Sequence, residues 1–271
     1  MKLIIQIPCY NEAETLPVTL ADLPRQVDGL DRVEWLVIDD GSTDDTARVA
    51  REHGVGHVVS HTKNQGLARA FMTGLDSSLN LGVDVIVNTD ADNQYNAADI
   101  PALVKLVLDK QADIVVGARP VNGIKHFSFL KKIQDLGSWV VRKVSGTDIS
   151  DAPSGFRAFS REAAMHLNVF NEYTYTLETI IQAGQKNMAI TSVPVRVNED
   201  LRPSRLLKSI PSYIQRSIMT IVRIFVVYKP FRFFFAIGAV LLGIGALIGM
   251  RFLWHYFAGD GAGHVQSLIL A

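Results

Sequence analysis

The sequence predicts an α/β protein built on a mostly parallel sheet with helices on both faces. Apolar runs of strand length alternate with segments of helical periodicity over the first 120 residues, and the loops between them are short. This alternation is typical of parallel sheets, whose two faces are buried under helices. Polar residues follow the strands at their carboxyl ends, where α/β proteins bind ligands. The predicted strands are residues 3–8, 33–38, 57–61, 83–88 and 114–117.

The helices between these strands are predicted from their end signals and apolar spacing. Pro17 is expected to weaken the interior of the first helix, because proline removes a backbone donor. Ser42 is a good N-cap for the second helix, and Gly54 suits the position after its end. Asn96 is expected to cap the fourth helix. The predicted helices are residues 11–22, 42–52, 66–79 and 96–109.

The pattern becomes less regular after residue 119. Pro194 falls within a strand-like segment and suits a strand at the edge of a sheet. We expect this half of the domain to form the second wall of the ligand cleft. Its predicted elements are a helix over 127–144, a short strand or turn over 154–159, a helix over 174–183 and a strand over 188–197.

The stretch VIVNTDADNQY, residues 85–95, carries the most informative polar residues. Asp90, Asp92 and Gln94 lie two residues apart, so in an extended segment their side chains point to one side. Two carboxylates and one amide oxygen that converge predict a divalent cation, and such ligands favour Mg²⁺ or Mn²⁺ over Zn²⁺. Because Mg²⁺ often completes its shell with substrate phosphate, the pattern indicates a nucleotide-diphosphate site. The alternative is a solvated acidic turn.

Charge is distributed unevenly along the chain. The 271 residues include 27 basic and 27 acidic ones, but the first 200 carry 19 and 26 of them, a balance of −7. Residues 201–232 hold seven basic residues and no acidic one. This basic collar argues against nucleic-acid binding and fits a segment beside anionic lipid headgroups. The single cysteine, Cys9, excludes an internal disulfide, and the seven histidines show no zinc-binding spacing.

The C-terminal segment is predicted to meet a membrane. Residues 204–228 combine an apolar stripe with basic residues, which favours an amphipathic interfacial helix over an ordinary packing helix. Residues 233–250, FFFAIGAVLLGIGALIGM, are uncharged, and with residues 253–257 they can span ~30 Å of hydrocarbon. Gly245 and Gly249 form a G-x-x-x-G pattern, which is weak evidence for a homo-oligomer.

These features predict the domain plan and the location of the protein. Because the basic collar precedes the span, the positive-inside rule predicts a cell-membrane protein whose globular domain is cytoplasmic. The predicted parts are a globular domain over 1–200, a basic amphipathic juxtamembrane helix over 201–230, a transmembrane helix over 231–257 and the start of a second span over 264–271.

Several motifs resemble those of a known enzyme family. IPCYNEAETL at residues 7–16 and VIDDGSTDDT at residues 37–46 look like the opening of family-2 glycosyltransferases with a GT-A (Rossmann-like) fold. NTDADNQY at residues 88–95 matches their metal-binding segment. Within that family the chain is similar to dolichyl-phosphate mannose synthases and bacterial polyprenyl-phosphate hexosyltransferases. The matching points there are Gly117-Ala118-Arg119, Ser154-Gly155-Phe156-Arg157 and Arg202-Pro203-Ser204-Arg205.

The resemblance implies roles for individual residues. The base and ribose of a sugar nucleotide are expected against Pro8, Tyr10, Glu12, Ile38 and Asp40. The diphosphate is expected beside Asp90 and Ala91, and the Mg²⁺ or Mn²⁺ ion at Asp92 and Gln94 with Asp90 close by. The phosphates of the donor or of the lipid are expected to meet Arg119, Arg202 and Lys208. The residues expected to serve catalysis are Asp92, Arg119, Asp151, Arg157 and Arg202.

Some of these residues have simpler alternatives. Asp40 also suits a plain turn before a helix. Arg157 and Asp151 are also compatible with a structural ion pair across a loop. Glu178 suits a surface charge or the acidic residue that many family-2 enzymes use as a base, and a structural or positioning role is favoured. The stretch at residues 63–66 suits either a wall of the donor pocket or a strand-to-helix turn.

The function that the resemblance implies is metal-dependent, inverting transfer of a hexose from a nucleotide-diphosphate sugar to a polyprenyl or dolichyl phosphate at the membrane surface. Mannose from GDP-mannose is favoured, with UDP-glucose as the nearest alternative. A lipid monophosphate is mostly dianionic at neutral pH and therefore needs positioning more than a general base. The alternatives are a glycan or glycolipid acceptor, a sugar-1-phosphate nucleotidyltransferase and a non-catalytic membrane adaptor. A dehydrogenase is disfavoured because no G-x-G-x-x-G follows the first strand.

Overall fold

The computed structural model describes most of the globular part and one long C-terminal helix. The described residues are 1–120, 146–147, 149, 151–169, 175–199, 219, 222–223, 226–227, 230–259 and 269. The predicted helix over 127–144, most of the one over 204–228 and nearly all of the segment 264–271 therefore lie outside the described residues. The chain divides into two compact units, Met1–Ile210 and Pro211–Ala271.

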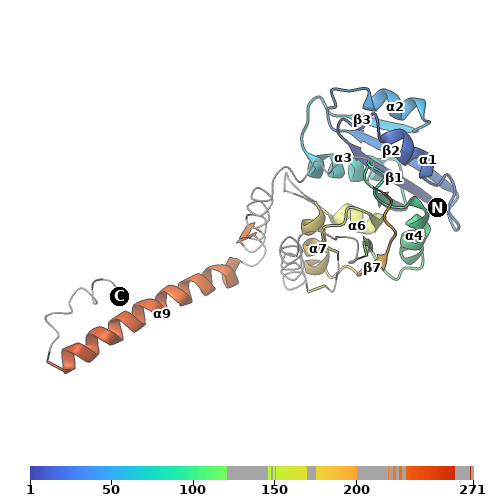
Figure 1. Ribbon diagram of the computed structural model, residues 1–271. Helices are drawn as coiled ribbons and strands as arrows, with labels where there is room; N and C mark the ends of the chain where they lie inside the picture. Colours follow the sequence, from blue (N-terminus) through green and yellow to red (C-terminus); the bar gives the residue numbers. More distant parts are fainter. Residues whose placement is uncertain are drawn as a thin grey trace. The chain divides into compact units, whose positions relative to one another are not determined.

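The first unit is built on a sheet that has seven strands in its described part (Figure 1). Their order is β3-β2-β1-β4-β6-β5-β7. All neighbouring pairs are parallel except those of β6, which runs antiparallel to both β4 and β5. The predicted mostly parallel sheet is therefore confirmed. The strands are β1 (Lys2–Cys9), β2 (Arg32–Asp39), β3 (His57–Ser60), β4 (Val85–Asn88), β5 (Ile114–Ala118), β6 (Arg157–Ser160) and β7 (Ile190–Pro194).

The register brings the polar strand ends to one edge of the sheet. Cys9 at the end of β1 pairs with Asp39 at the end of β2, and Gln6 pairs with Asn88 at the end of β4. Because β6 is reversed, Arg157 at its beginning lies opposite Asn88. The loop that precedes β6 therefore reaches the same edge as the loops that follow β1, β2 and β4.

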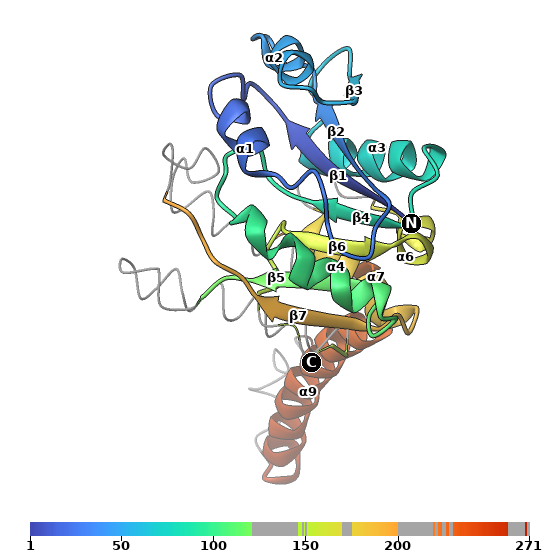
Figure 2. The same cartoon turned by 90° about the vertical axis from the view of Figure 1, so that its right-hand side faces the viewer.

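Helices cover both faces of the sheet (Figure 2). One apolar cluster joins the sheet to α1, α2 and α4, and the other joins it to α3, α6 and α7. Successive residues of β1 alternate between the clusters, as strand geometry requires: Leu3 and Ile5 belong to the first and Ile4 to the second. The helices are α1 (Leu16–Asp22), α2 (Thr46–Glu52), α3 (Leu67–Asn80), α4 (Ile100–Leu108), α6 (Arg161–His166) and α7 (Thr176–Gln185), with a 3₁₀ turn η1 (Ala97–Asp99) before α4.

Two helix starts were predicted wrongly. The helix α1 begins at Leu16, so Pro17 lies in its first turn, where a missing N–H costs nothing. The N-cap position of α2 is Asp45, while Ser42 instead accepts a hydrogen bond from the backbone of the first loop. The cap at Asn96 is confirmed, since its side chain accepts from the N–H of Ala98.

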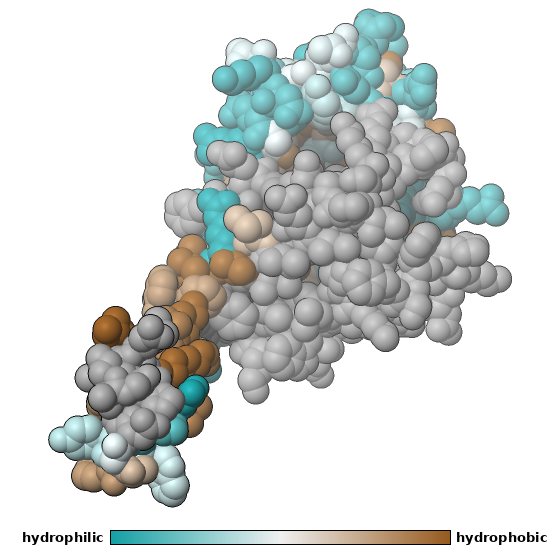
Figure 3. All heavy atoms as spheres, turned by 60° about the vertical axis from the view of Figure 1, so that its left-hand side comes forward, coloured by the Kyte–Doolittle hydropathy of each residue, from teal (hydrophilic) through white to brown (hydrophobic). Residues whose placement is uncertain are grey.

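The second unit contains α9 (Pro230–Phe257), a helix of 28 residues. It is the single helix in the described part of the chain that is long and apolar enough to cross a membrane. None of its most apolar window is buried within the protein, and apolar side chains cover it (Figure 3). The helix includes the residues 233–250 that the sequence singles out.

Candidate active site

Hydrogen bonds join the loops that follow β1 and β2. The N–H of Asn11 donates to Ser42 Oγ (2.9 Å), and Asn11 Oδ1 accepts from the N–H of Thr43 (2.8 Å). The N–H of Glu12 donates to Thr46 Oγ1 (2.9 Å). Asn11 has a left-handed backbone (φ 55°), a conformation that asparagine adopts more readily than most residues. The sequence therefore builds a stiff double loop at the strand ends.

An acidic depression of about 590 Å³ lies in this double loop. Residues 11–15 and 43–45 line it. Glu12 is 9% exposed, and its Oε2 accepts a hydrogen bond from Thr15 Oγ1 (2.7 Å). Tyr10 is 42% exposed and so remains accessible to a ligand.

Pro8 and Ile38, both predicted to meet the donor, are adjacent in the register of β1 and β2. Both are buried, and the Ile38 side chain belongs to the core cluster that contains Phe71 of α3. The Ile38 side chain therefore faces the core, and any contact with a ligand at the strand ends falls to its backbone.

Asp40 anchors the loop that follows β3. Its Oδ1 accepts from the N–H of Gln65 (2.9 Å) and lies 2.7 Å from His61 Nδ1, and its Oδ2 accepts from the N–H of Gly66 (2.8 Å). A carboxylate only accepts, so Nδ1 of His61 carries a proton, while Nε2 lies 3.0 Å from Thr73 Oγ1. His61 is a site residue that the sequence did not single out.

Gly41 lets these two loops approach each other. Its φ is +69°, and a Cβ there would lie 2.3 Å from the carbonyl carbon of Lys63. The stretch at residues 63–66 is thus packed against the end of β2, rather than being an isolated turn before α3.

The segment after β4 is not extended, so the geometric argument for convergence of Asp90, Asp92 and Gln94 is wrong. The chain turns at Ala91 and Asp92, and Asn93 has a left-handed backbone (φ 56°). The turn is closed by Asp92 Oδ1, which accepts from the N–H of Gln94 (3.2 Å). Any meeting of these side chains therefore depends on the turn and not on strand alternation.

Neighbouring elements hold this turn in place. Thr19 of α1 donates its hydroxyl to the carbonyl of Ala91 (2.8 Å), and Asn93 Nδ2 donates to Asp22 (2.8 Å). The chain that leaves β7 crosses to the turn from the other side (Figure 2). There Asn198 donates through Nδ2 to the carbonyl of Asn93 (2.9 Å) and through its N–H to that of Gln94 (2.9 Å).

The Asp90 carboxylate stands apart from these bonds. It is partly exposed, and none of the described residues donates a hydrogen bond to it. Burial, followed by the negative charge of Asp92, raises the pKa of Asp90 to about 7, although Arg119 and Arg157 oppose the shift. Asp90 is therefore a carboxylate that is only about half ionised near neutral pH, and a nearby cation would favour its ionised form.

Arg119 pairs with Asp151 through a bidentate bridge. Its Nε and Nη2 donate to the two carboxylate oxygens (2.8 and 2.9 Å), and its N–H donates to Oδ2 (3.1 Å). Arg119 stays 27% exposed along its side chain. The bridge ties the end of β5 to the loop before β6 and leaves the guanidinium facing the strand-end edge.

The proposed pair of Arg157 with Asp151 is wrong. The Arg157 side chain is fully buried and donates to the carbonyls of Ala152 (2.7 Å), Ser154 (2.8 Å) and Thr176 (2.8 Å). Burial lowers the pKa of Arg157 to about 10, which leaves it charged at neutral pH. In this structure Arg157 holds the loop before β6 against the start of α7.

Three further predicted residues have different outcomes. Arg202 and Lys208 lie outside the described residues. Glu178 is only 8% exposed, and its carboxylate accepts from Gln182 Nε2 (3.4 Å), so the surface-charge alternative is wrong.

The residues at the turn after β4 fit a divalent cation. Asp90 receives no hydrogen bond from the described residues and lies close enough to Asp92 for the two charges to interact. No group of three or more His, Cys, Asp or Glu side chains meets among the residues that the structure describes. Two carboxylates with an amide oxygen suit an ion such as Mg²⁺, which completes its shell with water and substrate phosphates. They do not suit zinc, which prefers a closed nitrogen and sulfur cage.

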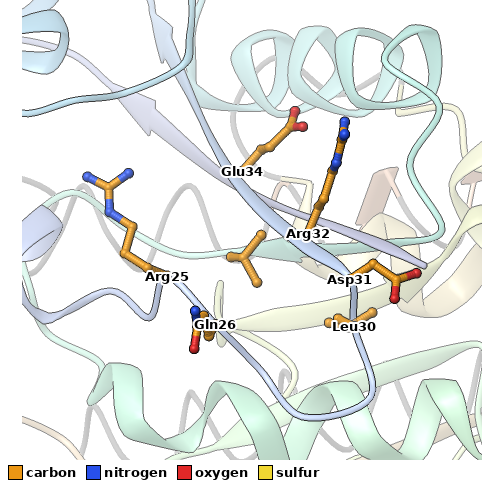
Figure 4. A pocket seen from close by; sticks show the side chains of 7 residues that line it. Arg25, Gln26, Leu30, Asp31, Arg32 and Glu34 are labelled. Carbon is orange, nitrogen blue, oxygen red and sulfur yellow. The ribbon is translucent and has the colours of Figure 1, made fainter.

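A second depression has a volume of about 350 Å³, and Figure 4 shows the side chains that line it. It is lined by residues around Arg32, at the start of β2, whereas Asp39 ends that strand. The length of β2 therefore separates it from the strand ends by ~23 Å. Arg25 at its wall stacks on Trp35 (3.3 Å from the guanidinium carbon to the ring centre). This depression therefore has no contact with the candidate active site.

Comparison with known proteins supports the assignment of the fold and the family. The sequence model of glycosyl transferase family 2 matches residues 4–167. The undecaprenyl-phosphate mannosyltransferase of Micrococcus luteus is 31% identical over 76% of this chain and 88% of that protein. The UDP-N-acetylglucosamine–dolichyl-phosphate N-acetylglucosaminyltransferase of Methanococcus voltae is 29% identical over 70% of this chain and 83% of its own.

A solved structure agrees at the level of the fold. Glucosyl-3-phosphoglycerate synthase from Mycobacterium tuberculosis, crystallised with Mn²⁺, UDP and glucosyl-3-phosphoglycerate, matches with a TM-score of 0.63 and 21% identity over 81% of this chain and 79% of that one. The predicted GT-A fold and the predicted family are confirmed. The chain belongs to glycosyl transferase family 2 and is a glycosyltransferase.

Proposed function

We propose that this glycosyltransferase transfers a hexose, with mannose favoured, from a nucleotide-diphosphate sugar to a polyprenyl phosphate at a membrane surface. The observation that supports it most is the Asp90 carboxylate, which has no hydrogen-bond donor among the described residues and lies next to Asp92 at the edge where the strands end. The named relatives from Micrococcus luteus and Methanococcus voltae act on undecaprenyl phosphate and dolichyl phosphate. They differ in the sugar, so GDP-mannose, UDP-glucose and UDP-N-acetylglucosamine are all candidate donors.

The nucleoside of the donor is proposed to bind at the loops after β1 and β2. Tyr10 offers an exposed aromatic face, and Pro8, Glu12, Ile38 and Asp40 form the rest of this part of the site. Asp40 then acts in two ways, since it also fixes the loop at residues 65–66.

The diphosphate is proposed to lie at the turn after β4, beside Asp90 and Ala91. A Mg²⁺ or Mn²⁺ ion held by Asp92 and Gln94, with Asp90 close by, would neutralise the charge that develops on the departing diphosphate. Arg119 faces this edge with a guanidinium that Asp151 holds in a fixed orientation. Such a fork of donors suits phosphate oxygens.

The chemistry then needs little proton transfer. An oxygen of the lipid phosphate attacks the anomeric carbon, the bond from that carbon to the diphosphate breaks, and the nucleoside diphosphate leaves with the electron pair, with inversion. The lipid monophosphate is mostly dianionic at neutral pH and is nucleophilic without a strong base. Arg202 and Lys208 are proposed to hold the phosphates, and Arg157 to act through the loop that it positions.

Membrane attachment is proposed to bring the site to the lipid. The helix α9 has the length and composition of a span, and basic residues precede it. The positive-inside rule then places the catalytic domain in the cytoplasm.

The proposal is tested with membranes that contain the full-length chain, undecaprenyl or dolichyl phosphate, Mn²⁺ and each labelled donor in turn. Label is expected in the lipid fraction with one of the three donors. Asp92→Asn is expected to lower that transfer at least about 100-fold, because it removes a ligand charge at a site of diphosphate departure. Asp76→Asn, a matched change on the exposed surface of α3, is expected to leave it unchanged. No lipid-linked label with any donor would refute the proposed acceptor.

A further inference from the structure

Gly155, in the loop before β6, is held by side chains from three different elements. Its N–H donates to Tyr95 Oη (3.2 Å), and its carbonyl accepts from Asn88 Nδ2 (2.9 Å) and from Tyr175 Oη (3.3 Å). Asn88 ends β4, Tyr95 follows the turn that carries Asp90, and Tyr175 precedes α7. Both backbone groups of this one residue are therefore fixed by the surroundings of the turn.

The missing side chain of Gly155 leaves room for Asp90. A Cβ on Gly155 would lie 3.2 Å from both carboxylate oxygens of Asp90 and 2.8 Å from Tyr175 Oη. A separation of 2.8 Å is shorter than a Cβ tolerates, so the Tyr175 hydroxyl, Asp90 or the loop would have to move. No described residue donates a hydrogen bond to Asp90, so the close approach of Gly155 is one of the local restraints on its carboxylate.

A buried polar chain supports Tyr175 from behind. The Tyr175 hydroxyl accepts a hydrogen bond from Asn88 Nδ2 (2.8 Å). Asn88 Oδ1 in turn accepts one from Nε2 of Gln6 in β1 (2.9 Å). The Tyr175 ring stacks on Phe71 of α3, with centres 3.9 Å apart. Burial and the neighbouring Asp90 raise the pKa of Tyr175, so its hydroxyl keeps the proton that it donates to Gly155. The stacked ring and the two hydrogen bonds together hold the hydroxyl in place.

We propose that Tyr175 and Gly155 are positioning residues for Asp90: the hydroxyl of Tyr175 fixes the backbone of Gly155, and that backbone sets where the Asp90 carboxylate stands. The inference rests on the proposed role of the Asp90–Asp92 turn as a divalent-cation site. It assigns to these two residues a role that acts through Asp90. The loop before β6 thereby becomes part of the cation site without supplying a ligand.

The test measures Mn²⁺ affinity of the full-length protein in detergent, from the electron paramagnetic resonance signal of free Mn²⁺ with and without nucleoside diphosphate. Gly155→Ala and Tyr175→Phe are each expected to weaken Mn²⁺ binding by about 10- to 100-fold, the usual effect of losing support around a metal ligand. The control Gly56→Ala adds a Cβ with nothing within 4 Å and is expected to bind Mn²⁺ normally.

The double variant Gly155→Ala/Tyr175→Phe separates positioning from general damage. Removing the hydroxyl removes the 2.8 Å contact, so the double variant is expected to bind Mn²⁺ at least as well as Gly155→Ala alone. Losses that simply multiply, or Mn²⁺ binding by Tyr175→Phe equal to that of the unaltered protein, would overturn the inference. The thermal unfolding midpoint of each variant is also measured in EDTA. A merely structural defect is expected to lower this midpoint in proportion to the loss of Mn²⁺ binding.

The Asp92→Asn variant distinguishes this inference from the proposed function beneath it. If Asp92→Asn binds Mn²⁺ like the unaltered protein, the cation site itself is wrong, and the inference falls with it. If Asp92→Asn loses Mn²⁺ binding while Gly155→Ala and Tyr175→Phe retain it, the cation site stands and only the positioning role is refuted.

Discussion

Asp90 shows how a single residue can be costly to the fold and useful to the site. Its carboxylate is close to Asp92, partly buried and without a donor among the described residues, so its ionised form is poorly stabilised by the protein alone. By contrast, Asp40 and Asp151 receive hydrogen bonds from backbone or arginine donors. At the residue scale, therefore, an external positive charge would stabilise the ionised form of Asp90 more than that of Asp40 or Asp151.

The raised pKa of Asp90 predicts how the stability of the protein depends on pH. The pKa of Asp90 is about 7 in the folded protein and near ~3.9 in the unfolded chain, so between these values the folded state binds more protons. The contribution of Asp90 to the free energy of unfolding then falls as pH rises from about 4 to about 7. Asp90→Asn cannot ionise. The difference between the thermal midpoint of Asp90→Asn and that of the unaltered protein, both measured in EDTA, is therefore expected to shift in favour of the variant as pH rises from 5 to 8.

The control for this pH series is Asp45→Asn. The hydrogen bond from Arg48 lowers the pKa of Asp45, which lies exposed on α2, so its substitution is expected to give no such gain. A difference between Asp90→Asn and the unaltered protein that stays constant from pH 5 to pH 8 would contradict the ionisation argument.

At the scale of elements, the segment that follows β7 acts as a clamp on the turn after β4. Residues 196–198 reach the turn through Asn198, through the bridge of Val197 with Tyr95, and through Arg196, whose guanidinium pairs with Asp99. The clamp joins the last strand of the sheet to the centre of the strand-end edge. Residue 202, with its proposed phosphate contact, follows four positions later.

Asn198→Ala is expected to loosen this clamp. It removes the hydrogen bond from Nδ2 to the carbonyl of Asn93 and costs about 1 kcal/mol locally. Amide hydrogen exchange in residues 93–96 is expected to accelerate, while the exchange of β1 stays unchanged. Gln111→Ala, an exposed change elsewhere, is the control. Unchanged exchange in residues 93–96 would show that the turn does not depend on the Asn198 side chain.

The elements also show what the sequence can and cannot predict. The strands β1 to β5 follow from buried apolar runs, which are a local signal. The reversal of β6 does not follow, because pairing direction is decided by partners about 70 residues away. Asn93 interrupted the extended geometry expected for Asp90, Asp92 and Gln94. The contact of Asn88 with Tyr175 joins residues 87 positions apart, so no spacing in the sequence could indicate it.

At the scale of the whole molecule, the chain joins a globular enzyme to an apolar helix. In the globular unit the described large apolar side chains are mostly buried, whereas along α9 most are exposed, among them Leu241 and Leu242. The window of α9 that is most apolar has none of its residues buried in the described part of the chain. Membrane insertion is the environment that its length and composition fit.

A charge at the middle of α9 is expected to disturb insertion. Leu242→Arg places a cation near the centre of the span, at a cost of about 3 kcal/mol on insertion scales. The fraction of protein that resists alkaline extraction from membranes is expected to fall sharply. Leu253→Arg, close to the end of the helix, is the control and is expected to have a smaller effect because its side chain reaches the interface. Equal extraction of both variants would contradict a span centred on residue 242.

The two arginines of α9 give the proposed span a defined length. Arg232 and Arg251 enclose the 18 uncharged residues 233–250, which rise ~27 Å as a helix. This is slightly less than the ~30 Å of an average hydrocarbon core, so the helix has no excess length to absorb by tilting. In a thicker bilayer the arginines or the lipids must deform instead. With the proposed span, acyl-chain length becomes a variable that would act on this enzyme through its anchor, independently of the proposed lipid acceptor.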